Sequence, residues 1–233
     1  MSLFVLADTH LSENTEKPMD IFGSRWSDWT AKLCENWKST VSDGDTVVIP
    51  GDISWAMSLD EAAKDLQLLD GLPGKKIIGK GNHDYWWATI KKTEEFFAKE
   101  KIKSISLLYN NSFLADGKAI CGCRGWFIDE KISPKDTDYD KIVAREAGRL
   151  ELSLKSAETF GDAERVVFFH FPPVFGDFVC RELIDVLKKY GVKRCFYGHI
   201  HGKYDMEPTL TYDGIDLTIV SADYLKFRPL KIV

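Results

Sequence analysis

The sequence predicts an α/β chain in which two packed sheets are covered by helices on their outer faces. Short apolar runs rich in β-branched and aromatic residues recur along the 233 residues, and several stop abruptly at a polar cluster. Amphipathic segments separate the early runs, whereas the last third of the chain is rich in strand-like segments. This order favours two layers of sheet rather than one. No linker, internal repeat or low-complexity tract interrupts it, so we expect a single domain over residues 1–233.

The expected strands are short and mostly buried. Five of them precede polar residues: SLFVLA before Asp8, TVVIP before Gly51, KKIIG before Gly81, RVVFF before His170 and RCFY before Gly198. Their length and composition are typical of buried strands. Further strands are expected from Ile105 to Tyr109, from Lys118 to Gly122, and near 204–206, 209–212, 215–220 and 229–233. Asp213-Gly214 is expected to form the turn of a hairpin.

The expected helices are amphipathic. Apolar residues recur at helical spacing in two sets: Trp26, Trp29, Leu33, Trp37 and Val41, and then Leu59, Ala62, Ala63, Leu66 and Leu69. Ser58-x-x-Glu61 precedes the second set and predicts a capping box. We expect further helices near 87–100, 140–158 and 178–190.

Composition limits the classes of function. No apolar run approaches the roughly 20 residues that span a bilayer, and the first ten residues lack the basic region of a secretory signal. The five cysteines are odd in number and scattered, which fits a reducing compartment, so we expect a cytoplasmic protein. A net charge of −5 without a Lys/Arg block argues against general binding to nucleic acid or to membranes. The negative charge does not exclude small anionic substrates, because bound divalent cations can reverse the local electrostatic field.

All five histidines, at positions 10, 83, 170, 199 and 201, fall at or just after the end of an expected strand. Ligands of open α/β sheets collect outside the carboxyl ends of strands, so these loops are expected to converge on one cleft. Asp8-x-His10 and His199-x-His201 place two side chains at i and i+2, where they can reach one ion. Each short motif also has an ordinary structural interpretation as a turn, and a lone His170 could be a core residue.

Two more blocks add oxygen donors. Gly51-Asp52 follows a buried strand, and Gly81-Asn82-His83-Asp84 combines an amide oxygen, an imidazole and a carboxylate within one turn. Carboxylate, amide and imidazole donors without thiolate suit Mn, Fe, Zn, Ni or Co. An aspartate can also bridge two such ions.

In the order Asp-x-His, Gly-Asp, Gly-Asn-His-Asp, His, Gly-His-x-His, the sequence resembles the calcineurin-like metallophosphoesterase superfamily from Asp8 to Gly202. The resemblance implies a four-layer α/β/β/α sandwich of two mixed sheets flanked by helices. It also implies a phosphoesterase with two divalent metal ions, in which a metal-bridging hydroxide attacks a phosphate monoester or diester of a small molecule.

The resemblance assigns roles by motif position. Asp8, His10 and His201 would hold one metal, Asn82, His170 and His199 would hold the other, and Asp52 would bridge them. His83 would face the substrate as a catalytic residue, and Asp84 would orient it.

The match departs from the family at the phosphate clamp. Many phosphatases of the superfamily carry arginine soon after Gly-Asp, but here Ile53 to Met57 contain none. Arg124, at another strand end, is a candidate replacement that binds substrate, although it could equally be a surface arginine packed over Trp126. Tyr85-Trp86-Trp87 could line the cleft, and at least one of the tryptophans is expected to be core.

Two other functions are compatible with the resemblance. One is a nuclease of the same fold, against which the acidic balance counts. The other is a non-catalytic metal-binding scaffold for protein interactions, which would be expected to lose ligands that this chain keeps. The physiological substrate, the native metal and the oligomeric state are not predicted.

Overall fold

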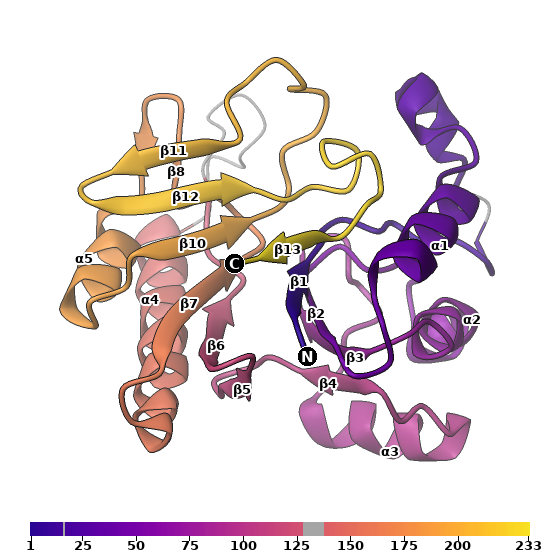
Figure 1. Ribbon diagram of the computed structural model, residues 1–233, viewed down its shortest axis with the longest axis horizontal. Coiled ribbons are helices and arrows are strands. Elements are labelled where there is room, and N and C mark those ends of the chain that lie inside the picture. The colour runs from indigo at the N-terminus through magenta and orange to yellow at the C-terminus, as the bar shows by residue number, and fades with distance from the viewer. Residues whose placement is uncertain (16, 128–137) are drawn as a thin grey trace.

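The computed structural model describes residues 1–15, 17–127 and 138–233 and contains two large mixed sheets (Figure 1). The first has the order β13-β1-β2-β3-β4. Its strands are β13 (Leu230–Ile232), β1 (Leu3–Val5), β2 (Thr46–Pro50), β3 (Lys75–Gly79) and β4 (Ile105–Leu107). Strands β1 to β4 are parallel, and β13 pairs with β1 in the antiparallel sense. The polar segments after β1, β2 and β3 therefore leave the same edge of this sheet.

The second sheet has the order β11-β12-β10-β7-β6-β5. Its strands are β11 (Thr209–Tyr212), β12 (Ile215–Ile219), β10 (Arg194–Tyr197), β7 (Glu164–Phe169), β6 (Lys118–Cys123) and β5 (Phe113–Ala115). The four central strands are parallel, and antiparallel strands β11 and β5 close its two ends. A small third sheet pairs β8 (Val174–Phe175) with β9 (Phe178–Val179).

Helices cover the outer face of each sheet (Figure 1). The first sheet carries α1 (Trp29–Thr40), α2 (Leu59–Asp70) and α3 (Ile90–Glu100), and the second carries α4 (Tyr139–Ser156) and α5 (Arg181–Lys189). Short 3-10 helices occur at η1 (Met19–Phe22), η2 (Ser24–Trp26) and η3 (Ala157–Phe160). The arrangement is the four-layer α/β/β/α sandwich that the resemblance implies.

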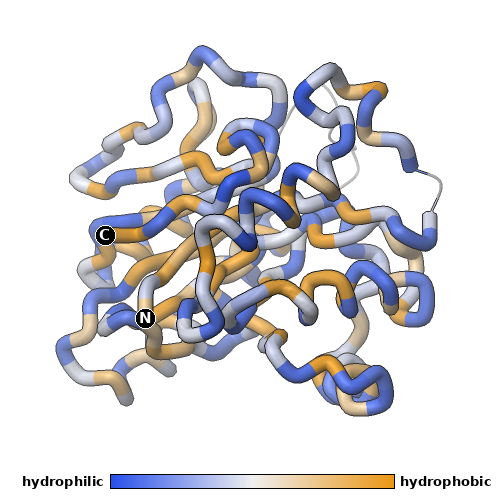
Figure 2. The backbone as a smooth tube through the Cα atoms, turned by 45° about the vertical axis from the view of Figure 1, so that its right-hand side comes forward, coloured by the Kyte–Doolittle hydropathy of each residue, from blue (hydrophilic) through white to orange (hydrophobic). Residues whose placement is uncertain are grey.

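Three buried clusters fill the spaces between the layers, because side chains alternate along each strand. In β7, Val166 and Phe168 pack between the two sheets, whereas Val167 packs beneath α4 and α5. In β1, Val5 faces the other sheet and Phe4 faces the helices. Figure 2 shows the same organisation as hydrophobic colour concentrated in the central strands.

Local signals confirm several expected elements. Ser58 caps α2 by accepting a hydrogen bond from the Glu61 N–H, although the Glu61 carboxylate accepts from Met57 N–H rather than from Ser58 N–H. Asp213 and Gly214 both have positive φ, at 51° and 77°, and form the hairpin turn between β11 and β12. All five cysteines are free. Among the described residues, no helix combines the length and the apolar character needed to cross a membrane.

Other expectations are wrong in detail. Helix α1 begins at Trp29 rather than Trp26, because η2 ends at Trp26 and the left-handed φ of 50° at Asp28 separates it from the α-helix. Residues 178–179 belong to β9, so the last expected helix begins at Arg181. The strand expected near 204–206 is a turn. Strand β5 was not expected, although the Asp116-Gly117 turn that joins it to β6 is a hairpin signal.

Candidate metal centre

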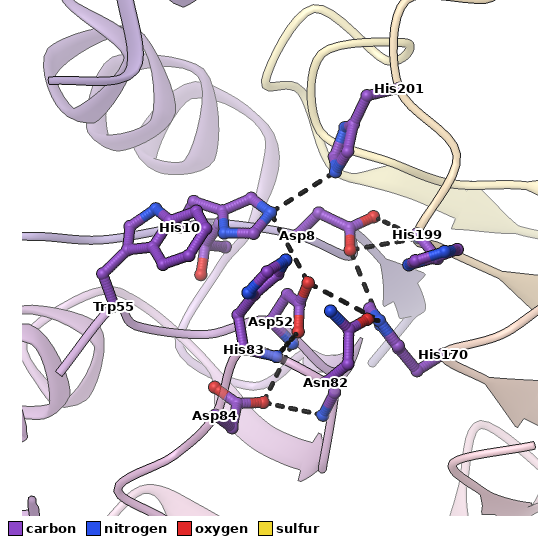
Figure 3. A network of polar contacts seen from close by, with 12 residues as sticks. Asp8, His10, Asp52, Trp55, Asn82, His83, Asp84, His170, His199 and His201 are labelled. Atoms are coloured by element: carbon purple, nitrogen blue, oxygen red, sulfur yellow. Dashed lines mark hydrogen bonds and ion pairs between the residues drawn. The ribbon is translucent and has the colours of Figure 1, made fainter. Parts of the chain in front are cut away.

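The site residues leave the carboxyl ends of five parallel strands and meet in one place (Figure 3). From the first sheet come Asp8 and His10 after β1, Asp52 after β2, and Asn82, His83 and Asp84 after β3. From the second sheet come His170 after β7, and His199 and His201 after β10. The site is therefore shared by both sheets.

Six of these residues form two compact sets of possible ligands. Within the set of Asp8, His10 and His201, one donor atom from each residue lies within 4.8 Å of the others, and the same holds for the set of Asp52, His170 and His199.

Asp52 joins the two sets. Its Oδ2 lies 3.6 Å from Nε2 of His10 and 3.5 Å from Nε2 of His170. Asn82 belongs with the second set, because its Oδ1 lies 2.6 Å from Nε2 of His170.

The backbone bends sharply at four of these residues. Asp8, His10, Asp52 and His199 have positive φ values of 59°, 44°, 51° and 69°. This left-handed region disfavours residues with a Cβ, and such strain persists only where the surroundings impose it. The ligand-bearing loops are thus held in conformations that isolated chains would rarely adopt.

Glycines let these loops approach each other. A Cβ on Gly81 would lie 2.0 Å from Oδ1 of Asp52, and one on Gly198 would lie 2.6 Å from Oδ2 of Asp8. A Cβ on Gly51 would lie 2.8 Å from Nδ1 of His170. The glycine of each motif therefore makes room for a carboxylate or imidazole from another loop.

Asp84 fixes the backbone of the loops and does not orient the ring of His83. Its buried carboxylate accepts hydrogen bonds from the N–H groups of Asp52, Ile53 and Gly81 at 2.9, 2.8 and 2.7 Å. Longer bonds come from Ser54 N–H and from the indole of Trp86. Neither oxygen bonds to the His83 ring in the described part of the chain, so the expectation that Asp84 orients His83 is wrong. Asp84 instead fixes the backbone that carries Asp52 to the loop that carries Asn82.

Asp223 is a positioning residue that the sequence did not reveal. Its Oδ1 lies 2.9 Å from Nδ1 of His201, and its Oδ2 accepts from Gly202 N–H at 3.1 Å. This leaves Nε2 of His201 directed towards Nε2 of His10, 3.3 Å away. The only signal in the sequence was that Ser221-Ala222-Asp223 follows another parallel strand, β12.

Burial shifts the pKa values of the carboxylates and the imidazoles of the cluster in opposite directions. Burial raises the pKa of Asp8 to about 6, although the charge of His201 opposes the shift. Burial, Asp84 and Asp8 together hold the pKa of Asp52 well above its usual value. Burial lowers the pKa of His199 to about 4 and holds those of His10 and His170 far below the ordinary value.

The arrangement fits divalent metal ions. Among the residues that the structure describes, the buried Oδ2 of Asp52 accepts no hydrogen bond, and Nδ1 of His170 has no hydrogen-bond partner. Buried polar atoms are rarely left without partners unless an ion or water completes them. Neutral imidazoles beside buried carboxylates are the donors that borderline divalent metals require.

A pocket of about 310 Å³ opens onto the cluster. Its polar floor includes His10, Asp52, His83 and His201. Its walls are aromatic and apolar, formed by Met19, Phe22, Trp26, Trp55 and Tyr204. Within the described residues, no Lys or Arg lines it.

The comparisons with known proteins decide the family. A family model described as calcineurin-like phosphoesterase matches residues 1–203. The chain belongs to the calcineurin-like phosphoesterase family. No curated protein matches the sequence.

Solved structures share the fold at low sequence identity. A phosphopantetheinyl hydrolase from Mycobacterium tuberculosis is 14% identical with a TM-score of 0.58, and the alignment covers 100% of this chain and 95% of that one. A protein of unknown function from Aquifex aeolicus is 16% identical with a TM-score of 0.53, covering 99% and 95%. A Thermus thermophilus protein is 11% identical with a TM-score of 0.55, covering 99% and 97%.

His83 lies in the pocket beside the two sets of ligands. Its ring centroid is 4.3 Å from that of Trp55, and its Nδ1 has no hydrogen-bond partner (Figure 3). Its backbone N–H donates to Oδ1 of Asp52 at 2.8 Å. Burial lowers the pKa of His83, and the charges of His201 and Lys17 add to that shift.

Arg124 lies in different surroundings from those expected. Its side chain lines a second pocket and is absent from the lining of the pocket at the cluster. Its guanidinium carbon lies 5.3 Å from the centroid of the Trp126 ring, as the packing interpretation predicts. Of the aromatic segment after Asp84, Trp86 is core, Tyr85 is 56% exposed, and Trp87 lines the second pocket.

Proposed function

We propose that this protein hydrolyses phosphate esters of small molecules with the help of two divalent metal ions. The main support for this proposal is the position of Asp52. Within the described residues its Oδ2 has no hydrogen-bond partner, and this oxygen lies between one imidazole from the first ligand set and one from the second. A shared carboxylate between two ions is the arrangement that two-metal phosphoesterases use.

We propose the division of ligands that the family resemblance implies. Asp8, His10 and His201 are proposed to hold one ion, and Asn82, His170 and His199 the other, with Asp52 contributing to both. When bound, the ions supply Lewis acidity and lower the pKa of water to generate a nucleophile. The donors suit Mn, Fe, Zn, Ni or Co.

The chain's own residues position the ester and its leaving group. His83 lines the pocket, and within the described residues its Nδ1 has no hydrogen-bond partner, so its ring is available to the substrate. We propose that this ring donates a hydrogen bond to the departing oxygen, on which negative charge develops. Because the pKa of His83 is lowered, the neutral imidazole is the expected donor near pH 7.

The pocket favours an ester with an apolar or ring-containing organic group. Trp26, Trp55 and Phe22 offer faces on which such a group can pack. No Lys or Arg belongs to the described lining, although Lys17 and Arg25 pack over the rings of Trp55 and Tyr204, so the metal ions are proposed to balance most of the substrate charge. A phosphodiester carries one negative charge and a phosphomonoester up to two, so we expect diesters to be the better substrates.

The test is a screen with metal-stripped protein reloaded with each candidate ion. Bis-p-nitrophenyl phosphate and p-nitrophenyl phosphate form a matched pair of diester and monoester with one leaving group. A phosphopantetheinyl ester belongs in the panel, since a hydrolase named for it shares the fold. We expect metal-dependent turnover that is faster on the diester. Turnover that is unchanged after metal removal, or absent from every ester, would contradict the proposal.

DNA binding and ester turnover distinguish the two alternative functions, a nuclease and a non-catalytic scaffold, from the proposed one. The pocket at the cluster is small and its described lining holds no cation for a nucleic-acid backbone. Salt-dependent DNA binding would nevertheless favour the nuclease. A full metal complement without turnover of any ester would favour the scaffold.

A further inference from the structure

A second and larger pocket lies beside the metal centre. Its volume is about 620 Å³, within the range of small-molecule sites, and it shares no lining residue with the first pocket. It opens where the chain leaves β3, β4 and β6 and where one face of α4 passes over them. Nothing in the proposed hydrolysis uses it.

Positive side chains dominate this second pocket. Lys80, Arg124, Arg145 and Arg149 line it, and Glu146 is the one carboxylate among its lining residues. Glu146 is fully buried and its Oε1 is held by Arg149 at 2.5 Å. Within residues 1–15, 17–127 and 138–233, the other three cations have no ion-pair partner. Such a concentration is unexpected in a chain whose net charge is −5.

The guanidinium of Arg124 is incompletely satisfied. Its Nε is buried and has no hydrogen-bond partner. The guanidinium carbon of Arg124 lies 5.3 Å from the ring centroid of Trp126 and 5.9 Å from that of Phe171. These contacts explain how the side chain packs, but the rings supply no hydrogen-bond acceptor for Nε. A buried donor without an acceptor in the described part of the chain is unfavourable, so an anion that reaches Arg124 would supply what is missing.

We infer that this second pocket binds a small polyanion, such as a metabolite with two or more phosphate groups, at a site separate from the metal centre. Arginine forks match phosphate oxygens in two parallel hydrogen bonds, and three arginines with a lysine suit more than one phosphate. Trp87 and Tyr109 add aromatic surface on the same wall for an organic group.

The second pocket adjoins the backbone of the metal centre. Lys80 immediately precedes the loop that carries Asn82 and His83. The carbonyl of Arg124 accepts hydrogen bonds from the N–H groups of His170 and Phe171, at 3.2 and 2.9 Å. A ligand bound here would contact segments that also position Asn82 and His170.

The experiment measures binding of inorganic pyrophosphate to the metal-stripped full chain by calorimetry. Arg145→Gln removes an exposed pocket cation and keeps a helix-forming residue, and it should weaken binding about tenfold, as expected for one charge-assisted contact. Glu146→Gln removes the one carboxylate and should strengthen binding. Lys155→Gln is the matched control, because Lys155 is an exposed cation of α4 outside the pocket, and it should leave binding unchanged.

Each outcome decides the inference. No detectable binding, or equal affinities for Arg145→Gln and Lys155→Gln, would overturn it. Loss of folding in Glu146→Gln, seen by circular dichroism, leaves the comparison of Arg145 with Lys155 decisive. Because neither metal nor ester is present, failure of the proposed hydrolysis would not affect the result, and a crystal soaked in pyrophosphate should show the anion at Arg124 and Arg145.

Discussion

Single carboxylates perform different tasks around the metal centre. Asp52 keeps an oxygen without a hydrogen-bond partner, whereas Asp84 gives both oxygens to N–H donors and Asp223 gives one to His201 and the other to Gly202. A carboxylate saturated by backbone donors fixes the loop conformation, and one with a free oxygen is available to an ion. Among these three aspartates, the hydrogen bonds separate the proposed ligand from the positioning residues. The distinction does not extend to Asp8, a proposed ligand whose two oxygens both accept from His199 N–H, at 3.1 and 2.9 Å.

Substitution of His83 tests its role at the leaving group. We expect His83→Asn to keep the fold and both metals and to lose activity by ~10²–10⁴-fold, typical of a lost proton or hydrogen-bond donor. The loss should be severe for alkyl esters and milder for p-nitrophenyl esters, whose phenolate leaves without help. Measured rates on both ester types and metal analysis check this. Equal losses would argue against donation to the leaving group, and loss of a metal ion would make His83 a ligand.

Asp223→Asn should weaken the first ligand set without unfolding the protein. The amide can no longer fix the protonated Nδ1 of His201 as firmly, and loss of such an outer hydrogen bond typically costs 10–100-fold in metal affinity. Metal affinity from competition with a chelator is the measurement. Asp213→Asn, at the exposed turn between β11 and β12, is the control and should leave affinity unchanged. Equal affinities for the two variants would remove Asp223 from the account.

Metal affinity should fall as the pH is lowered. Burial raises the pKa of Asp8 to about 6, and bonds to Asp223 together with the charge of Asp8 outweigh burial to raise that of His201. Protons therefore compete with the ion at Asp8 below about pH 6, and the raised pKa of His201 adds competition there, so each displaced proton lowers affinity about tenfold per pH unit. Chelator competition at about pH 7.5 and about pH 5.5 measures the effect. An affinity that is the same at both would contradict these pKa directions.

At the scale of residues, the sequence revealed the side chains of the motifs but not the residues that position them. The histidines stood out because all five follow strands, and the structure brings them to one cluster. Asp223 could not be recognised, because its role depends on contact between β12 and the loop after β10. Arg124 was a candidate for binding substrate, with packing over Trp126 as an equal alternative, and its side chain lines the second pocket rather than the pocket at the cluster.

At the scale of elements, strand ends and glycine turns build the site. Parallel strands deliver their following loops to one edge of each sheet, and the glycines at 51, 81 and 198 allow those loops to touch. The strands that carry ligands were predictable from their apolar runs. Three short elements were not: β5 has three residues, and β8 and β9 have two each. Such elements depend on pairing with distant partners more than on local composition.

Gly81→Ala tests the close approach of the loops. Its Cβ would lie 2.0 Å from Oδ1 and 2.3 Å from N of Asp52, so Asp52 must move. We expect lower thermal stability, weaker metal binding and lost activity. Gly148→Ala in α4 is the matched control, because its Cβ meets nothing within 4 Å, and it should stabilise the helix by up to ~1 kcal/mol. Thermal unfolding of both variants decides, and a Gly81→Ala protein that binds metal normally would refute the packing argument.

At the scale of the whole molecule, both sheets contribute residues to the candidate metal centre. The first sheet supplies Asp8, His10, Asp52 and Asn82, and the second supplies His170, His199 and His201. Each ligand set draws on both sheets, so neither sheet alone could hold an ion with all of its expected donors. The four-layer fold was predicted through the order of motifs, and the match to the family over residues 1–203 confirms it.

The central claim is that two ions share Asp52. Crystals of the protein, stripped and reloaded with Mn²⁺, should be measured for anomalous scattering, which locates each ion without assumptions about ligands. We expect two sites per chain, one beside Asp8, His10 and His201 and one beside Asn82, His170 and His199, with Asp52 contacting both. A single fully occupied site, with Asn82 and His170 turned away from it, would contradict the account.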